Sequence, residues 1–277
     1  MNDQDYEYLK RKLLTLTGID LDSYKSQQMR RRLNMFYAHT GAGNIMEYCQ
    51  MIKHDRDMLD KLRNFITINV SEFFRDSASF TQLRTSILPL LLKQNPRLNI
   101  WSAGCSHGAE PYSVALALEG ISPGGRHRIL ATDIDDGALK RARAGGPYNP
   151  AEVKNVSSSI LQKYFINSSG DYMFSEKIKR KVEFRQQNLL RDRFEDGFHL
   201  IICRNVTIYF TEEAKRGINQ RFFNALRPGG ILFIGGTEAM LDVTNLGFIG
   251  LKPSFYQKPV PGVVEERQTR REVLLRA

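Results

Sequence analysis

A run of small residues, Ser102-Ala-Gly-Cys-Ser-His-Gly108, follows a short apolar segment and precedes one with helical spacing, Pro111 to Leu118. Small residues at a strand-to-helix turn let the backbone approach a ligand and direct the first amides of the helix towards it. Such turns also occur as plain tight connections, and the spacing is not the G-x-G-x-x-G of a dinucleotide-binding loop. The run is therefore a candidate ligand-binding turn centred on Gly104, without a dinucleotide fingerprint.

An acidic string, Ala131-Thr-Asp-Ile-Asp135, follows the next apolar segment. An acid at this point of a doubly wound fold can accept both hydroxyls of a ribose, although an aspartate after a strand is also a common helix cap, which is our expectation for Asp135. The chain has no G-x-x-x-x-G-K-[ST] loop for nucleotide phosphates and no arginine placed for a 2′-phosphate. Together the turn and the acid favour an adenosyl ligand without phosphates.

Two further strings place polar side chains near the predicted sheet edge. Arg204 and Asn205 follow an apolar strand within Cys203-Arg-Asn-Val-Thr-Ile-Tyr-Phe210, which puts them at the carboxyl-end crevice of an open sheet. Upstream, Asn69-Val-Ser-Glu-Phe-Phe-Arg75 connects the first part of the chain to the second, with two aromatics expected in the core. The residue types alone leave two roles open for Arg75, that of a site residue and that of a surface ion-pair residue.

The elements that must position these residues form two parts. The sequence pattern of residues 1–75 predicts helices only. The first helix has Leu9 and Leu13 on one face and is expected to end at Gly18. Asp22 or Ser23 is expected to cap the second helix. Two more helical segments follow residues 40–44. This pattern predicts a small all-α domain packed as a bundle.

Residues 76–258 alternate short apolar runs with helical segments, which predicts an α/β domain with a parallel sheet. A turn is expected at Arg227-Pro-Gly-Gly230, and a small antiparallel insertion near 165–182. The insertion is expected to pair Asp171–Ser175 with Lys177–Lys181, and residues 259–277 to form a mobile tail. The predicted strands are Leu98–Ala103, Arg128–Thr132, Val182–Gln186, His199–Cys203 and Ile231–Gly235.

Composition narrows the classes of protein. The 277 residues are 42% hydrophobic and 25% charged, which is ordinary for a globular chain. No membrane span or signal peptide is recognisable, so we expect a cytoplasmic protein, and the three scattered cysteines predict reduced thiols and no metal site. The formal charge of +10 favours an acidic partner, and residues 23–46 lack acids while containing Lys25 and Arg30-Arg-Arg32.

In combination these strings resemble one family, the chemotaxis receptor methyltransferases of the CheR type. Members of this family transfer a methyl group from S-adenosylmethionine to glutamate side chains of bacterial chemoreceptors. The resemblance extends from the basic second helix to about Lys258 and implies an S-adenosylmethionine-dependent, Rossmann-like methyltransferase domain with a small β insertion, preceded by a small all-α domain. Its motifs are Thr67–Arg75, Ile100–Ser113, Ala131–Asp135, Asn188–Leu190, Ile202–Phe210 and Gly235-Gly-Thr-Glu238.

The resemblance also implies roles for single residues. A receptor-docking role is implied for Arg30, Arg31 and Arg32, and catalytic positioning roles for Arg75 and Tyr209. The product would be S-adenosylhomocysteine, and the partners the cytoplasmic methylation helices of chemoreceptors. The implied cofactor-binding residues are Asn69, Ser71, Arg75, Gly104, Glu110, Asp133, Asn188, Leu189, Arg204 and Asn205.

Two features of the chain depart from the family pattern. His107 and Ala109 stand where the family usually has threonine and a second acid, which predicts a modest change in cofactor affinity. The insertion around Asn167–Gly170 is short, which predicts an enzyme independent of a receptor carboxyl-terminal pentapeptide tether. We also expect a monomer that neither binds nucleic acid nor inserts into a membrane.

Three other classes of protein compete with this interpretation. A nucleic-acid methyltransferase would account for the positive charge, but the fourth strand lacks the [DN]PP[YF] string and no aromatic-rich basic groove is evident. A non-catalytic S-adenosylmethionine or receptor binder, or a methyltransferase of another signalling protein, stays open. A dehydrogenase is disfavoured because the dinucleotide fingerprint is missing.

Overall fold

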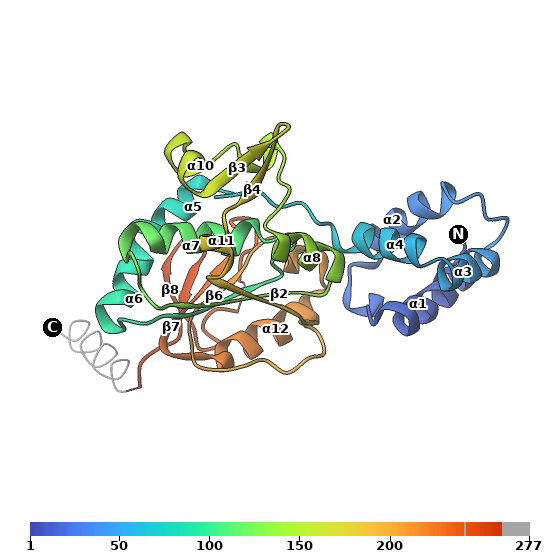
Figure 1. The fold of residues 1–277 in the computed structure, drawn as a ribbon. Coiled ribbons are helices and arrows are strands. Elements are labelled where there is room, and N and C mark those ends of the chain that lie inside the picture. The colour runs from blue at the N-terminus through green and yellow to red at the C-terminus, as the bar shows by residue number, and fades with distance from the viewer. Residues whose placement is uncertain (241, 262–277) are drawn as a thin grey trace, which may run out of the picture.

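The computed structural model describes residues 1–240 and 242–261 and begins with a group of helices (Figure 1). Asn2 closes a capping box on the first helix, and Gly18 ends it in the left-handed conformation, as predicted. Asn44 and Asp55 cap the third and fourth helices through side-chain acceptance of backbone amides. The elements of this group are α1 (Asp3–Thr17), the 3₁₀ turn η1 (Leu21–Ser23), α2 (Ser26–Ala38), α3 (Ile45–His54) and α4 (Arg56–Thr67).

The start of α2 differs from the prediction. The helix begins at Ser26 with Lys25 as its cap residue, so neither Asp22 nor Ser23 caps it. The cause is a tertiary contact, because the backbone of Tyr24 and Lys25 is extended and residues 23–25 pair with residues 209–211 of the second part of the chain. That pairing delays the helix by one turn.

The second part of the chain is a seven-stranded sheet in the order β5-β2-β1-β6-β7-β9-β8. The first five of these strands are parallel, and β9 runs antiparallel to both β7 and β8. The chain adds β2 and β5 on one side of β1 and then β6 and β7 on the other, so its direction of winding reverses between β1 and β6. Ligands of open α/β sheets bind at such a switch point, beyond the carboxyl ends of the strands. The strands are β1 (Asn99–Ala103), β2 (Arg128–Asp133), β5 (Val182–Gln186), β6 (Phe198–Cys203), β7 (Leu226–Ile234), β8 (Ile249–Lys252) and β9 (Phe255–Gln257).

Helices cover both faces of this sheet (Figure 1). On one face Ile100 and Phe233 share a core with α5 to α7, whereas on the other Trp101 and Leu232 share a core with α12. The second core also contains Leu9 and Leu33 of the helical part, so the two parts are joined by apolar packing. These elements are α5 (Ser77–Gln82), η2 (Leu83–Ile87), α6 (Leu88–Gln94), α7 (Ala109–Ile121), α8 (Asp136–Ala144), η3 (Thr207–Tyr209) and α12 (Glu212–Ala225).

The turn predicted at Arg227–Gly230 lies inside β7. The ladder to β6 pairs Phe198 with Leu226 and then Leu200 with Ile231, so these four residues bulge out of the pairing without ending the strand. Gly229 N–H donates to Lys258 O and Lys258 N–H to Gly230 O, both at 2.9 Å. A partner distant in sequence therefore keeps this bulged segment within the strand, although Gly229 has φ +79°.

The insertion is antiparallel as predicted, but its partners differ. The strand β4 (Asp171–Phe174) pairs with β3 (Phe165–Ser168), whereas Lys177–Lys181 contains the short helix α11 (Glu176–Lys179). Ile178 on α11 is fully buried, which explains why this segment packs as a helix and does not extend the hairpin. The other helices of the insertion are α9 (Pro150–Val153) and α10 (Ser158–Tyr164).

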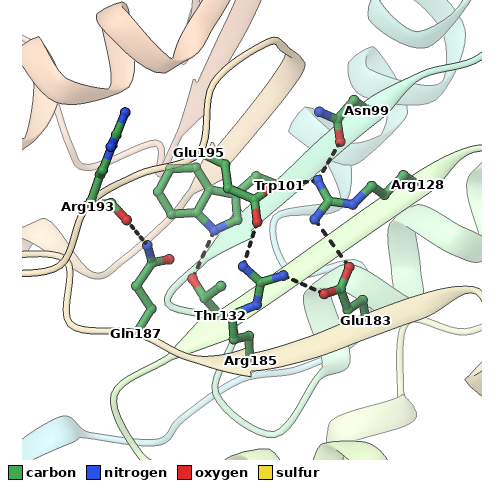
Figure 2. A network of polar contacts seen from close by, with 9 residues as sticks. All are labelled: Asn99, Trp101, Arg128, Thr132, Glu183, Arg185, Gln187, Arg193 and Glu195. Carbon is green, nitrogen blue, oxygen red and sulfur yellow. Dashed lines mark hydrogen bonds and ion pairs between the residues drawn. The ribbon is translucent and has the colours of Figure 1, made fainter.

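A polar network connects the outer strands β2 and β5 with the loop that follows β5 (Figure 2). Arg128 on β2 donates to Glu195 at 2.8 Å and pairs with Glu183 on β5 at 3.2 Å. Arg185 on β5 bonds the same two glutamates, at 2.5 Å and 2.6 Å. Although a single exposed ion pair contributes little, this shared set ties the loop after β5 to the sheet.

Three further predictions concern the cysteines, membrane-spanning helices and the tail. The three cysteines are buried and unpaired. No helix within residues 1–240 and 242–261 is long and apolar enough to cross a membrane. Residues 262–277 of the predicted mobile tail lie outside the described residues.

Candidate functional site

A cavity opens at the switch point. Every predicted cofactor-binding or catalytic residue lines it. The lining residues are Tyr24, Ile66–Glu72, Arg75, Gly104, Ser106, Glu110, Asp133, Ile134, Gln187–Leu189, Arg204–Val206, Tyr209 and Phe210.

The turn after β1 requires glycine at position 104. Gly104 has φ +79°, and a Cβ atom there would lie 2.4 Å from Cγ2 of Val206. The amides of Gly104 and Cys105 donate to Thr132 O at 2.8 Å and 2.9 Å, which holds the turn against the end of β2. The turn therefore presents bare backbone to the cavity, as a ligand-binding turn must.

Two aspartates, one at the end of β2 and one just after it, have different roles. Asp133 accepts the amides of Ser106 at 2.7 Å and Asp135 at 2.9 Å, and burial raises the pKa of Asp133 to about 6. Asp135 accepts the amide of Ala138 at 3.1 Å and so caps α8, as expected. Asp133 is thus the acid left facing the cavity.

The connecting segment, residues 69–75, lies along the cavity. Asn69 donates to Asp135 at 2.6 Å and accepts from the hydroxyl of Ser106 at 3.0 Å, which fixes the start of the segment. Arg75 donates to Val70 O at 3.1 Å, so its guanidinium folds back over the segment and lines the cavity with Ser71. This arrangement favours the site role of Arg75 over a surface ion pair.

Arg204 and Glu110 form one wall of the cavity. The Arg204 side chain is 2% exposed, stacks over Phe233 at 4.8 Å, and lies 3.8 Å from Glu110 and 3.5 Å from Asp76. Burial raises the pKa of Glu110, and the positive charge of Arg204 and a 2.8 Å hydrogen bond from Ser102 oppose that rise. Because Arg204 Nε has no hydrogen-bond partner among the described residues, this wall keeps polar capacity for a ligand.

Position 107, where the chain departs from the family pattern, faces away from the cavity. His107 is 2% exposed, and its Nε2 lies 3.2 Å from Glu152, which also accepts from Arg141 at 2.6 Å. Burial and the nearby Arg141 charge lower the pKa of His107 to about 4, so the ring is neutral near pH 7. The O atom of Glu152 accepts the amide of Phe73 at 2.9 Å, which anchors the connecting segment.

The loop after β5 supplies Asn188 and Leu189. Asn188 Nδ2 donates to Gly18 O at 3.3 Å, and its Oδ1 accepts the amide of Leu190 at 2.9 Å. Leu189 is 8% exposed and offers an apolar surface to the cavity. Asn188 therefore shapes the loop and connects it to the helical part.

Glu238 was not predicted as a site residue, although its string Gly235-Gly-Thr-Glu238 was noticed. Its carboxylate accepts four hydrogen bonds, from the amides of Asn205, Thr207 and Gly235 at 2.6, 2.9 and 2.9 Å and from the Thr207 hydroxyl at 2.9 Å. Asn205 has φ +58°, an unusual conformation for a residue other than glycine. Glu238 thus holds the strained loop that carries Arg204, Asn205 and Tyr209.

The three arginines of α2 differ in their availability. Arg30 donates to Asp3 at 2.5 Å and to Met1 O at 2.9 Å, and Arg32 donates to Phe65 O and stacks over the Phe65 ring. Arg31 is exposed. Of the predicted docking residues, Arg31 is the one whose guanidinium is directed to solvent.

Comparison with known proteins agrees with this site. The family model described as "CheR methyltransferase, SAM binding domain" matches residues 69–252, and the model described as "CheR methyltransferase, all-alpha domain" matches residues 4–67. The chain belongs to the CheR methyltransferase family. Its similarity to curated members covers most of both chains.

Three such members illustrate the similarity to this CheR-family chain. A chemotaxis protein methyltransferase of Listeria monocytogenes is 40% identical over 92% of this chain and 98% of its own. Chemotaxis protein methyltransferase 1 of Pseudomonas aeruginosa is 36% identical over 87% and 92%. Chemotaxis protein methyltransferase 2 of Vibrio cholerae is 31% identical over 97% and 95%.

The residues of the cavity fit S-adenosylmethionine. Asp133 offers carboxylate oxygens for a ribose, Gly104 leaves space at the turn, and Glu110 and Arg75 carry charges opposite to those of the ligand's amino and carboxylate groups. The buried, unpartnered Nε of Arg204 adds a donor on the same wall. This CheR-family chain is thus an S-adenosylmethionine-binding methyltransferase.

Proposed function

We propose that this enzyme methylates glutamate side-chain carboxylates of bacterial chemoreceptors and so forms glutamyl methyl esters for chemotactic adaptation. The names of the relatives support a role in chemotaxis. The chemistry of the cavity supports a carboxylate as the methyl acceptor.

The observation that carries the proposal is the kind of residue that lines the cavity. Among the described lining residues there is no histidine and no cysteine, Glu72 is paired with Lys154 at 2.6 Å, and we assign Asp133 and Glu110 to the cofactor. An amine or a hydroxyl acceptor must lose a proton to react, which usually calls for a general base. A glutamate carboxylate is already ionised near pH 7 and needs none.

The residues of the chain position the two reactants. S-adenosylmethionine supplies a methyl group on a positively charged sulfur, which a carboxylate can attack. Arg75 is placed to hold a carboxylate through charge-assisted hydrogen bonds, and Tyr209 through its hydroxyl, which makes no hydrogen bond to the described residues. Alignment of this kind can contribute about 7–11 kcal/mol to lowering a barrier.

The helical part offers a surface for an acidic helix. Gln27, Arg31 and Met35 follow one another at intervals of four residues along α2 and are exposed, so they share one face. The acid-free stretch of residues 23–46 gives this face a positive potential. We assign it as the docking face for the methylation helices of a receptor.

Two further parts of the proposal concern assembly. The β3–β4 hairpin has strands of four residues each, and we propose that the enzyme works as a monomer without a pentapeptide tether. A peptide with an aromatic-rich carboxyl terminus should show no saturable binding in calorimetry. Saturable binding would contradict independence from the tether.

The deciding experiment follows the methyl group. Purified protein is mixed with methyl-labelled S-adenosylmethionine and a chemoreceptor cytoplasmic fragment, and label released as methanol by mild alkali is counted. Esters release the label and N-methyl groups do not. Base-labile label that disappears when the receptor glutamates are changed to alanine supports the proposal, whereas base-stable label excludes it.

A charge-reversal pair tests the docking face. Arg31→Glu should reduce the transfer rate several-fold at low salt while leaving the affinity for S-adenosylhomocysteine unchanged, because Arg31 lies outside the cavity. Arg84→Glu is the control, since Arg84 is also exposed but lies in η2, next to α5 and α6 at the other end of the molecule (Figure 1). Equal losses in both variants would count against a docking role for α2.

A further inference from the structure

A residue near the start of the helical part reaches the cofactor cavity. Tyr24 lies between η1 and α2, whereas the other lining residues come from the end of α4, at Ile66 and Thr67, and from later positions. The side chain is deeply buried, with 9% of the residue exposed. The cavity is therefore closed on one side by a segment outside the methyltransferase sheet.

The position of Tyr24 is fixed from both sides. The amide of Lys25 donates to Tyr209 O and the amide of Thr211 donates to Ser23 O, both at 2.9 Å. The Tyr24 ring packs edge-on against Phe210, with centroids 4.8 Å apart and planes at 80°. Two backbone bonds and an aromatic contact thus hold the ring against the wall of the cavity.

Tyr24 and Asp133 both line the cavity. The hydroxyl of Tyr24 makes no hydrogen bond to the described residues, yet it is not one of the buried polar atoms without a partner, so it is open to the cavity. Burial raises the pKa of Tyr24, and the negative charge of Asp133 adds to the rise, so the hydroxyl stays protonated and able to donate. A ligand in the cavity can therefore supply its hydrogen-bond partner.

We propose that Tyr24 is a cofactor-binding residue contributed by the helical part, whose hydroxyl forms a hydrogen bond with the adenosyl portion of S-adenosylmethionine next to Asp133. The ring closes the cavity beside Phe210, and in the complex the hydroxyl that is open to the cavity takes the ligand as its hydrogen-bond partner. The inference builds on the cofactor assignment and is independent of the identity of the methyl acceptor.

The test is a titration of Tyr24→Phe with S-adenosylhomocysteine in a calorimeter. The substitution removes the hydroxyl and keeps the ring, and loss of one hydrogen bond should raise the Kd about three- to tenfold. The melting temperature of the free protein should stay the same or rise, because the hydroxyl has no partner to lose there. The increase in melting temperature caused by S-adenosylhomocysteine should be smaller than in the unsubstituted protein.

The matched control is Tyr48→Phe. Tyr48 is also a buried tyrosine of the helical part with a hydroxyl that makes no hydrogen bond within the described chain, but it does not line the cavity. Its substitution should leave the Kd unchanged.

Three results would overturn the assignment of Tyr24. They are an unchanged Kd in Tyr24→Phe, an equal rise in both variants, or a rise accompanied by a lower melting temperature of the free protein. Because the titration contains no methyl acceptor, its outcome is separate from that of the receptor assay.

Discussion

Glu238 allows a quantitative test of how the site loop is held. In Glu238→Gln one carboxylate oxygen becomes an NH₂ group that faces amide donors instead of accepting from them. Each oxygen accepts two hydrogen bonds, Oε1 from the amide and hydroxyl of Thr207 and Oε2 from the amides of Asn205 and Gly235. Two hydrogen bonds to a charged acceptor are therefore lost, which at about 1.5–3 kcal/mol each predicts a destabilisation of about 3–6 kcal/mol.

The assay is urea unfolding followed by tryptophan fluorescence. The chain has one tryptophan, Trp101, and it is buried in the core, so its emission reports global unfolding. The Kd for S-adenosylhomocysteine is measured alongside, and we expect it to rise because Asn205 lines the cavity. Thr207→Val is the milder variant, which removes the hydroxyl donor and should cost about 1–2 kcal/mol.

Glu213→Gln serves as the control for charge. Glu213 is exposed in the first turn of α12, and its substitution should change the unfolding free energy by less than about 1 kcal/mol. If Glu238→Gln unfolds within 1 kcal/mol of the unsubstituted protein, the hydrogen bonds assigned to Glu238 do not hold the loop, and the reasoning fails.

Three further predictions concern the cavity. Tyr209→Phe should lower turnover more than affinity for the cofactor, and normal turnover would remove Tyr209 from the mechanism. Because the pKa of Asp133 is raised to about 6, the acid becomes protonated as the pH falls through 6, and the affinity for S-adenosylhomocysteine should fall by up to tenfold per pH unit below that value. Calorimetry of the Asp133→Asn variant from pH 5 to 8 should show a weaker pH dependence of the affinity for S-adenosylhomocysteine, and an unchanged profile would contradict this role. Gly104→Ala should raise the Kd far more than Gly170→Ala, since both have positive φ but a Cβ atom at position 170 meets nothing within 4 Å, whereas one at position 104 meets Val206. Equal effects of the two alanines on calorimetric affinity would show that the contact with Val206 is unimportant.

The parallel sheet and most of the site were predictable because local signals specify them. Residues at the carboxyl ends of β1, β2 and β6 share one edge once the strands are parallel, so Gly104, Asp133 and Arg204 converge without further information. The connecting segment was recognised through the family resemblance, since spacing alone left Arg75 undecided. The order of the strands along the chain and their shared direction thus determine where most of the site residues lie.

The errors arose where a distant segment decides the local structure. The start of α2 depends on pairing with residues 209–211, and the inclusion of Arg227–Gly230 in β7 depends on Lys258. The hairpin partner could have been found, because Ser169 and Gly170 both have positive φ and form a two-residue turn between the strands on either side of them. Tyr24 gave no local signal, and Glu238 stood in a recognised string without an assigned role, because their roles depend on contacts across the fold.

The backbone pairing of Ser23 and Lys25 with Thr211 and Tyr209 also has a mechanical consequence. Lys25 caps the helix that carries Arg31, and Tyr209 is the residue proposed to align the acceptor. A protein substrate that displaces α2 must carry the Tyr209 backbone with it or break two bonds of about 0.5–1.5 kcal/mol each. If α2 docks the receptor and Tyr209 aligns the acceptor as proposed, docking and alignment are linked through these two bonds, so a substrate that binds α2 in the wrong position should be methylated slowly even when it is bound.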